Sequence, residues 1–432
     1  MKLLIKNGNI VDPKNKKEFI SDILVENSVI SKISKNIIDN SAKILDAKGF
    51  HIMPGFIDMY EHLRDPGNIE SEDIISGSIS AAAGGFTTVC TMPDTVPAVD
   101  CTDVLNYVNV KAKDVACVNI IQAVAITKGN EGKKLVDFEL LKKSNAKIFS
   151  NNPKYFLSAD ILNNAFYEIS KFNHLFIDNC IDINFVKDRV MNESDVSKTL
   201  GLKGIKNIAE DSMIARNLFI AMANGINYHI AKCSTKDSLK LISIYKDILK
   251  EKITCSVTPH HLCFCDEDII EDDSNYKTMP PLRSRNDRDA LIKGLKNGVI
   301  DVIVSGHSPQ LLSYKQIGFN NAPFGVISSQ TAFSICLENI VDKGILTLPE
   351  LIAKLSYNPS KILNLDNRGL IEEGNIADIC ISDINERYIL NYETIKSKSK
   401  NSPFINKELK GKIKYTLVGG KIVYNDMERI IE

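Results

Sequence analysis

Strand-like and helix-like patterns alternate eight times through the middle of the chain, and this alternation limits the folds open to it. Each short run of apolar and β-branched residues is followed by a segment with helical periodicity. The expected strands cover residues 55–59, 87–91, 119–125, 146–149, 175–179, 227–232, 253–258 and 301–305. Eight such units predict an α/β fold of the (β/α)8 TIM barrel type, assigned to residues 53–365.

A doubly wound open sheet is the competing arrangement of the same elements. Its dinucleotide-binding version has a Gly-x-Gly-x-x-Gly turn after the first strand. Here the first strand is followed by Tyr60-Glu61-His62-Leu63-Arg64, which contains no glycine. This absence counts against dinucleotide binding and favours the barrel.

The two ends of the chain resemble each other and differ from the middle. Residues 1–52 and 366–432 both contain short alternating strand patterns, and neither end is long enough to close a core alone. We therefore expect one small β-sandwich built from both termini. Asn7-Gly8 predicts a tight hairpin near the start, and Gly419-Gly420 predicts one near the end.

Composition excludes several classes of partner. The 432 residues are 44% hydrophobic and carry a formal net charge of −1, so bulk attraction to nucleic acid or to an anionic membrane is not expected. No apolar run reaches the length of a spanning helix, and the first residues do not resemble a signal peptide. The ten cysteines are scattered, which predicts buried thiols in a reducing cytoplasm.

In a barrel of this type the chemistry lies where the strands end. Polar residues follow five of the expected strands, and a zinc hydrolase needs three or four His, Asp or Cys ligands among such residues. The polar residues at these ends include Tyr60, Glu61, His62, Asn151, Asn179, Lys232, His307 and Gln310. His229 lies three positions before Lys232, so strand alternation predicts that it points the other way, toward the helices.

Longer motifs point to a known family. The segment 54–67 resembles the opening motif of the class I dihydroorotases in the amidohydrolase superfamily, with Tyr60-Glu61-His62 where the family has His-x-His. Motifs that match the family recur along nearly the whole chain, at residues 84–88, 258–262, 277–283, 322–325, 358–360, 374–378 and 401–404. The resemblance implies the barrel and the appended β-sandwich.

The same resemblance implies which residues should hold the metal. The family's six ligand positions fall on Tyr60, His62, Asn151, Asn179, Lys232 and Gly306, and only His62 is retained. The family's general base corresponds to Gly306, which cannot accept a proton. Lys232 brings a positive charge to the place of the metal, and no carboxylate remains to neutralise a divalent ion. We therefore expect no metal cofactor and no catalytic residue of the family type.

The substrate side is also altered relative to the family. The resemblance assigns carboxylate binding to Arg64, which is retained, and to an asparagine that is Asp94 here. Another family asparagine corresponds to Met279, and a family histidine corresponds to Gln310. His307 is retained at the end of the last strand. These five residues are the expected remnants of a substrate pocket.

Three functions remain open on this reasoning. The leading hypothesis is a catalytically silent dihydroorotase homologue of pyrimidine biosynthesis that is a structural partner of aspartate carbamoyltransferase, in a homo- or hetero-oligomer, as the resemblance implies. The alternative is an active cyclic amidohydrolase with one zinc held by His62, His307 and Glu61. The third is a binding module for a small anion. We further expect the Lys232 ammonium to fill the vacated metal volume and to pair with Glu61 or Asp94.

Overall fold

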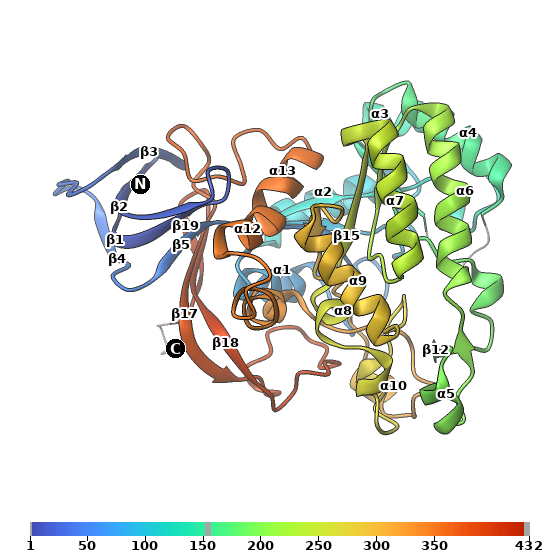
Figure 1. Cartoon of the computed structure of the whole chain (residues 1–432). Coiled ribbons are helices and arrows are strands. Elements are labelled where there is room, and N and C mark those ends of the chain that lie inside the picture. The colour runs from blue at the N-terminus through green and yellow to red at the C-terminus, as the bar shows by residue number, and fades with distance from the viewer. Residues whose placement is uncertain (1, 152–156, 427–432) are drawn as a thin grey trace.

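Parallel strands close into a barrel in the middle of the chain (Figure 1). The computed structural model describes residues 2–151 and 157–426. The barrel strands are β6 (Phe56–Glu61), β7 (Phe86–Thr91), β8 (Asn119–Gln122) with β9 (Val124–Ala125), β10 (Ile148–Ser150), β11 (Leu175–Asp178), β14 (Asn227–Ile230), β15 (Ile253–Val257) and β16 (Val302–Ile303). The His62 N–H donates to the His307 carbonyl at 3.0 Å and so connects the ends of the first and last strands. The predicted barrel is confirmed.

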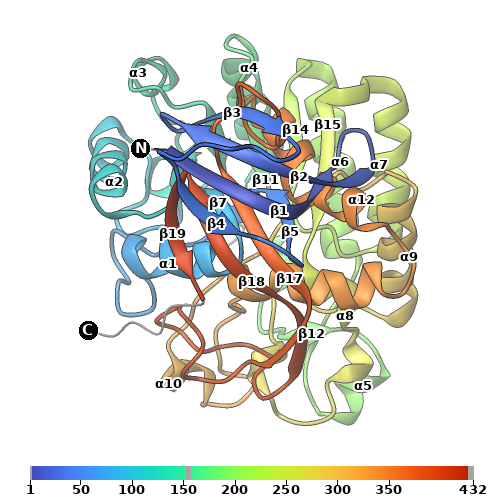
Figure 2. The ribbon, with the colours of Figure 1, turned by 90° about the vertical axis from the view of Figure 1, so that its left-hand side faces the viewer.

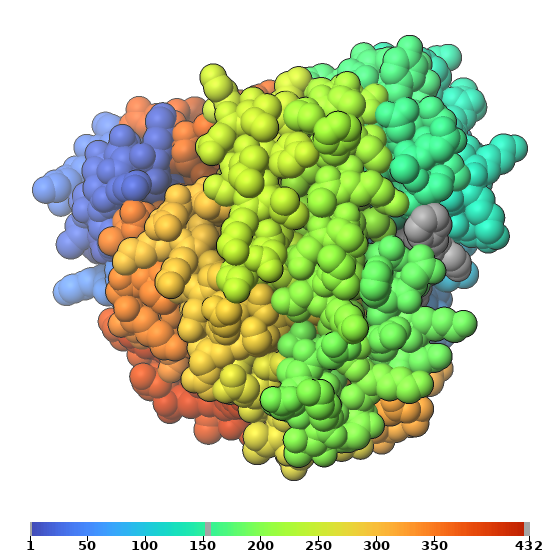
Figure 3. Space-filling model, turned by 45° about the vertical axis from the view of Figure 1, so that its right-hand side comes forward, coloured from blue at the N-terminus to red at the C-terminus, as the bar shows by residue number. Residues whose placement is uncertain are grey.

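Helices cover the outside of the barrel. The longer ones are α1 (Ile74–Ala83), α2 (Thr102–Val115), α4 (Ala159–Ser170), α6 (Ile208–Asn224), α7 (Lys236–Leu249) and α9 (Arg285–Lys296), and shorter ones include α3 (Phe138–Lys143), α8 (Pro259–Cys263) and α13 (Asn358–Ile362). In Figure 3 the segment from about residue 200 to 300, green to gold, forms a continuous outer face. Among the described residues no helix is long and apolar enough to cross a membrane.

One sheet is assembled from both ends of the chain, as predicted. Figure 2 shows the early strands, in blue, beside the late strands, in orange and red. The order is β19-β18-β17-β5-β1-β2-β3, with β4 paired to β1. The strands are β1 (Lys2–Asp12), β2 (Lys17–Glu26), β3 (Val29–Ser34), β4 (Lys43–Asp46), β5 (His51–Pro54), β17 (Ile379–Ile389), β18 (Glu408–Val418) and β19 (Lys421–Asn425).

The two predicted hairpins have different outcomes. Gly419-Gly420 connects β18 to β19, as expected. The hairpin at Asn7-Gly8 is wrong, because β1 continues through both residues. Asn7 has a φ of +64°, and the pairing of β1 with β2 shifts register there. The Asn-Gly pair therefore makes a bulge within a strand instead of a turn between two strands.

Apolar side chains fill both the barrel interior and the layer between strands and helices. Tyr228 belongs to the outer layer, with Phe166 and Phe176. The prediction that His229 faces the helices is wrong. Its ring lies 2.9 Å from Thr254 Oγ1 and 3.0 Å from Ser256 Oγ, and the alternate residues of that strand pack in the outer layer.

The cause lies beyond the strand end. Strand β14 ends at Ile230, and Lys232 has a φ of +59°. The alternation of side chains therefore does not continue from His229 to Lys232, and both can point toward the barrel axis. The cysteines are all free, and Cys180 and Cys233 are buried, as expected. Cys101, Cys117 and Cys263 are only partly buried, in contrast to the prediction of buried thiols.

Candidate functional site

A cavity of about 230 Å³ opens where the barrel strands end. Its lining includes all six residues at the family's ligand positions: Tyr60, His62, Asn151, Asn179, Lys232 and Gly306. Four of the five expected pocket remnants also line it, namely Arg64, Asp94, Met279 and Gln310. The parallel barrel explains this convergence, because the carboxyl ends of its strands meet on one face.

Lys232 projects its amine into this cavity from the end of β14. The residue is 7% exposed. Its Nζ donates to the Met279 carbonyl at 3.1 Å and lies 4.2 Å from the centroid of the Tyr60 ring. An ammonium over an aromatic face is attracted by the ring quadrupole. Burial nevertheless lowers the pKa of Lys232 to about 7, although the charge of Asp94 opposes this.

The expected ion pair of Lys232 is wrong. Among the residues that the structure describes, no carboxylate forms a salt bridge with its ammonium. Within the described residues, Asp94 pairs with His62 and Arg64. Glu61 accepts a hydrogen bond from Ser329. The Lys232 amine therefore uses a carbonyl and an aromatic face in place of a carboxylate.

Asp94 holds the two retained family residues together. The His62 Nδ1 lies 2.6 Å from one carboxylate oxygen, and the Arg64 Nη1 donates to the other at 3.2 Å. Arg64 also donates to Ser308 Oγ at 3.0 Å and to the Pro309 carbonyl at 3.4 Å. Burial lowers the pKa of His62 to about 4 in spite of Asp94, so the ring is neutral at pH 7. These contacts therefore engage Nε, Nη1 and Nη2 of the Arg64 guanidinium.

Gly306 occupies a backbone conformation that suits glycine. Its φ is +66°, in the left-handed region. A Cβ at this position would lie 2.8 Å from Thr258 Cγ2, 3.4 Å from His260 Cε1 and 3.6 Å from Lys232 Cδ. The family's general base would therefore meet both backbone strain and neighbouring side chains here.

Three polar atoms of the lining residues are buried without a hydrogen-bond partner. They are Asn151 Oδ1, Asn179 Oδ1 and His260 Nδ1. All three residues are at least nine-tenths buried. Burial raises the pKa of the neighbouring Tyr60 phenol, which keeps it protonated. Leaving such buried atoms without a partner is costly to stability.

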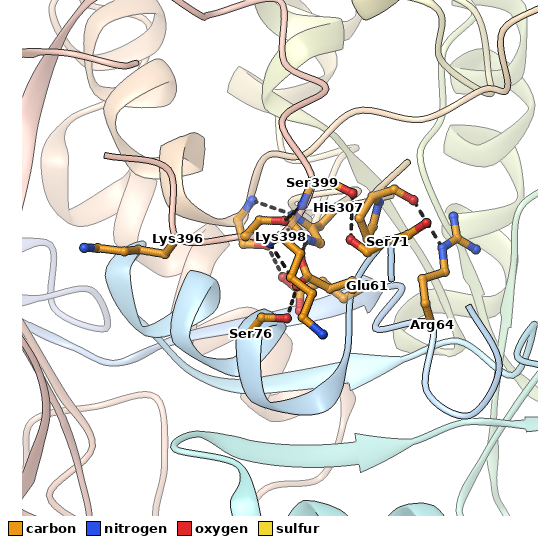
Figure 4. Close-up of polar contacts among 12 residues, drawn as sticks. Glu61, Arg64, Ser71, Ser76, His307, Lys396, Lys398 and Ser399 are labelled. Atoms are coloured by element: carbon orange, nitrogen blue, oxygen red, sulfur yellow. Dashed lines mark hydrogen bonds and ion pairs between the residues drawn. The ribbon is translucent and has the colours of Figure 1, made fainter. Parts of the chain in front are cut away.

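His307 does not line the cavity. Its Nε2 lies 3.4 Å from Glu72 Oε2, and its Nδ1 accepts from the backbone N–H groups of Ser328 and Ser329 at 3.2 and 3.4 Å. Figure 4 shows His307 beside Glu61 under the segment that carries Lys398 and Ser399. Burial, and next the charge of Asp58, raises the pKa of Glu61 well above its usual range. His307 and Glu61 thus belong to a buried polar cluster next to the cavity.

The residues of the cavity do not fit a zinc ion. Zinc sites in proteins use thiolate, imidazole and carboxylate ligands in a tetrahedral arrangement. The six positions offer one imidazole, one phenol, two amides, one amine and a glycine. Across residues 2–151 and 157–426, the group of His, Cys, Asp and Glu atoms close enough to share an ion is Cys265, Asp266 and Glu267, and none of these lines the cavity.

Sequence reasoning missed part of the lining. His260, Thr278, Phe324 and Val326 contribute to the cavity but were not expected there. The neighbouring His261 instead lies with its Nε2 3.2 Å from the Pro280 carbonyl. The signal was available, because Thr258-Pro259-His260-His261 directly follows a barrel strand.

The barrel, the sheet from both termini and the converging strand ends define a member of the amidohydrolase superfamily. A family model described as amidohydrolase family matches residues 190–423, and one described as dihydro-orotase-like matches residues 49–238. An L-hydantoinase (dihydropyrimidinase) from Arthrobacter aurescens has a TM-score of 0.87 at 23% identity, with 100% of this chain and 97% of that chain covered. A D-hydantoinase structure has a TM-score of 0.86 at 20% identity, over 99% of this chain and 96% of that chain. These structures show the same fold.

Sequence relatives narrow the assignment. A dihydroorotase from Aquifex aeolicus is 42% identical over 426 residues, which cover 99% of this chain and 100% of the relative. A dihydroorotase from Clostridioides difficile is 40% identical over 98% of this chain and 100% of its own length. The chain belongs to the dihydroorotase family.

Proposed function

We propose that this member of the dihydroorotase family lacks the zinc-dependent hydrolysis of cyclic amides. One observation carries the proposal: the six ligand positions implied by the family resemblance converge on one cavity, and five of them hold side chains that do not suit zinc. The Lys232 amine occupies part of the space, and Gly306 has a backbone conformation unfavourable to a carboxylate. Placing a divalent cation beside the charged form of Lys232 would add like-charge repulsion.

The energetic consequence is large. A catalytic zinc ion lowers the pKa of its bound water from about 15.7 to about 7. Loss of that effect removes roughly 9 pKa units of nucleophile activation, or about 12 kcal/mol at about 1.36 kcal/mol per unit. No residue in the cavity replaces it, because His62 is held by Asp94 and the family's base position is a glycine.

The proposed role is structural, within pyrimidine biosynthesis. The family resemblance implies that silent dihydroorotase homologues serve as partners of aspartate carbamoyltransferase. This proposal is supported by a complete barrel and sheet beside altered metal-ligand positions, as expected of a protein that binds a partner without catalysing the reaction. Mixed at micromolar concentration, this chain and the transferase of the same organism should elute together in size-exclusion chromatography. Two independent peaks would contradict the partnership.

A second function has its own support. The relatives from Aquifex aeolicus and Clostridioides difficile are named dihydroorotases and match over the full length. That likeness favours an active dihydroorotase with an atypical metal site. This function requires near-stoichiometric metal after purification. Replacing both His62 and His307 with alanine should then abolish turnover.

One experiment separates the two functions. The purified chain is supplied with zinc and assayed for conversion between carbamoyl aspartate and dihydroorotate, and bound metal is quantified in the same sample. The silent protein shows no turnover above the zinc-only control and no retained metal. Turnover with about one metal per chain would overturn the proposal and establish the active enzyme. A dihydroorotase that has His at both strand-1 positions serves as the positive control.

A further inference from the structure

We propose that the face of the barrel opposite the mouth carries a binding site for a nucleotide, whose phosphate is held by lysine amines. The site is separate from the mouth cavity, so it goes beyond the structural role proposed above and does not depend on it. Three features carry the inference: a cavity of suitable size, an excess of positive charge in its lining, and amide and apolar groups that suit a heterocyclic base.

This second cavity lies where the barrel strands begin. Its volume is about 660 Å³, larger than the cavity of about 230 Å³ at the mouth. Its lining includes residues at the starts of three strands and one residue of α13, namely Leu175 of β11, Asn227 of β14, Ile253 of β15 and Lys361. Sites for small molecules have volumes of about 300–1,000 Å³, so this cavity can hold a nucleotide.

The charge of the lining favours an anion. Four lysines line the cavity beside two acidic residues: Lys246, Lys250, Lys252, Lys361, Glu251 and Asp301. The formal excess is therefore two positive charges. A phosphate monoester carries about −1.5 to −2 charges at pH 7 and matches this excess.

Three of these lysines have no carboxylate partner. The Asp301 carboxylate is engaged by Lys246, whose Nζ lies 2.7 and 2.8 Å from its two oxygens. Across residues 2–151 and 157–426, Lys250, Lys252 and Lys361 form no ion pair. Lys252 Nζ donates to a neutral acceptor, the carbonyl of Gly225, at 2.7 Å, which leaves its charge uncompensated. These three cations can therefore approach a phosphate without first breaking a salt bridge.

The turn that carries Lys250 has an unusual backbone conformation. Lys250 has a φ of +50° and a ψ of −126°, which residues other than glycine rarely adopt. The turn is held by the Lys250 N–H, which donates to the Lys246 carbonyl, and by the Ile253 N–H, which donates to the Lys250 carbonyl. Strained residues of this kind cluster at ligand sites. Here the turn fixes the backbone of Lys250 and Lys252 at the rim of the cavity.

Groups that suit a heterocyclic base lie in the same lining. Asn227 Nδ2 donates to Asn173 Oδ1 at 3.0 Å. This bond uses the nitrogen of one amide and the oxygen of the other, so the Asn173 amide nitrogen and the Asn227 amide oxygen can pair with the acceptors and donors of a base. Leu175 and Ile253 add apolar contact surface. A nucleotide combines the anion and the base that these two sets of groups can bind.

Calorimetric titration of the full chain with adenosine monophosphate tests the proposal. We expect saturable binding that weakens as sodium chloride is raised from about 50 to about 300 mM, because salt screens the exposed lysines. Adenosine and inorganic phosphate should each bind at least about tenfold more weakly, since each lacks one of the two recognised parts. Ribose 5-phosphate that binds as tightly as adenosine monophosphate would overturn the assignment of a nucleotide. Absence of saturable binding of adenosine monophosphate would overturn the site itself.

A variant at the rim locates the binding. Lys250→Gly removes the amine and places glycine where φ is positive, so the variant should fold as well as the unaltered chain. Its affinity for adenosine monophosphate should fall at least about tenfold, which corresponds to about 1.4 kcal/mol. Lys240→Ala is the matched control, because Lys240 is an exposed cation of α7 that does not line the cavity, and its affinity should be unchanged. Unchanged affinity in Lys250→Gly would overturn the proposal.

Discussion

Near the barrel mouth, carboxyl groups are buried with too few hydrogen-bond donors to stabilise their charged form. Below the cavity, Asp58 and Glu61 are fully buried carboxyl groups. Burial raises the pKa of Asp58 to about 6, although N–H groups of Ser305 and Tyr60 donate to it. Glu61 Oε2 is buried without a hydrogen-bond partner. A site that retains such groups holds them at a cost to stability.

Glu61 gives a pH-dependent prediction. Its pKa is higher in the folded chain than in the unfolded chain, so the folded state binds more protons above about pH 4.5 and loses stability as the pH rises. Its titratable and polar neighbours are Asp58, Glu72, Ser329 and Ser305. Glu61→Gln removes this titration and should raise the free energy of unfolding at pH 8 by about 1–3 kcal/mol.

The gain should shrink at pH 5, where the carboxyl group of the unaltered protein is protonated. Urea unfolding at both pH values measures it. The exposed Glu70→Gln is the matched control and should change stability at neither pH. If the gain in unfolding free energy of Glu61→Gln over the unaltered chain were smaller at pH 8 than at pH 5, the assignment of a raised pKa would be contradicted.

Gly306 gives a second prediction at this scale. Gly306→Asp restores the residue type of the family's general base, but in a left-handed conformation and with its Cβ 2.8 Å from Thr258 Cγ2. We expect a loss of about 1–2 kcal/mol in unfolding free energy and no stoichiometric zinc. Gly306→Ala carries the same backbone cost without the carboxylate and should lose a similar amount. Zinc uptake near one ion per chain by the aspartate variant alone would show that a single residue restores the metal site.

At the scale of elements, a buried ion pair joins the loops on one side of the mouth. Glu210, in the first turn of α6, accepts from the N–H groups of Ser234 and Thr235 at 2.8 and 3.2 Å, just before α7 begins. Arg283 lies 3.6 Å from Glu210 and donates to Ser234 Oγ at 3.0 Å and to the Ile205 carbonyl at 3.0 Å. This contact fixes the loop that carries Lys232 relative to α6.

Breaking this pair should be costly. Glu210→Gln leaves Arg283 as a buried charge without its carboxylate, and such losses reach about 3–5 kcal/mol. Chemical denaturation followed by circular dichroism measures the change. Asp237→Asn removes an exposed pair with Lys240, where both side chains are more than half exposed, and should cost less than about 1 kcal/mol. If Glu210→Gln also lowered the unfolding free energy by less than about 1 kcal/mol, the buried pair would not fix the loop.

Elements were also the level at which sequence reasoning worked best. The barrel strands coincide with short strand-like runs in the sequence, such as Ile253–Val257. Predicting them therefore needs no long-range information. Reasoning failed where a residue left the regular conformation. Asn7 turns a hairpin signal into a bulge, and Lys232 breaks the alternation that should have placed His229.

Partner choice was the other failure. Lys232 was expected to fill the vacated metal volume and to pair with Glu61 or Asp94. Asp94 instead contacts His62 and Arg64, which lie about 30 positions earlier in the chain. Which of several nearby cations a carboxylate selects depends on side-chain geometry in three dimensions. The unpaired acceptors Asn151 and Asn179 were unpredictable for the same reason.

At the scale of the whole molecule, the C-terminal part returns across the barrel before it enters β18. The segment that carries Lys398 and Ser399 passes the start of α1 (Figure 4), and Asn401 contacts the loop after β16. Ser399 Oγ donates to the Ser71 carbonyl at 2.6 Å, and Lys398 Nζ donates to the Ile69 carbonyl at 2.9 Å. The sheet from both termini is therefore connected to the barrel mouth by the same segment.

Asn401 is the buried anchor of this segment and gives the last prediction. It is fully buried, and its amide donates to the Ser308 and Gly325 carbonyls at 3.1 and 3.0 Å and accepts from the Gln310 N–H at 3.1 Å. Asn401→Ala leaves these backbone groups short of a partner and should lower the unfolding free energy by about 2–4 kcal/mol.

Asn401 belongs to the segment between β17 and β18 and binds loops of the barrel. Its loss should therefore lower the stability of the barrel and of the sheet from both termini together. Urea unfolding followed by circular dichroism and by proteolysis should shift to lower denaturant together, as a single transition. The exposed residue Asn385 of β17 provides the control, and Asn385→Ala should stay within about 0.5 kcal/mol of the unaltered chain. If only proteolysis near residue 401 increased while the main transition stayed in place, the segment would open locally and independently. The barrel and the sheet would then be held together by other contacts, such as the packing of α1 and β7 against β18.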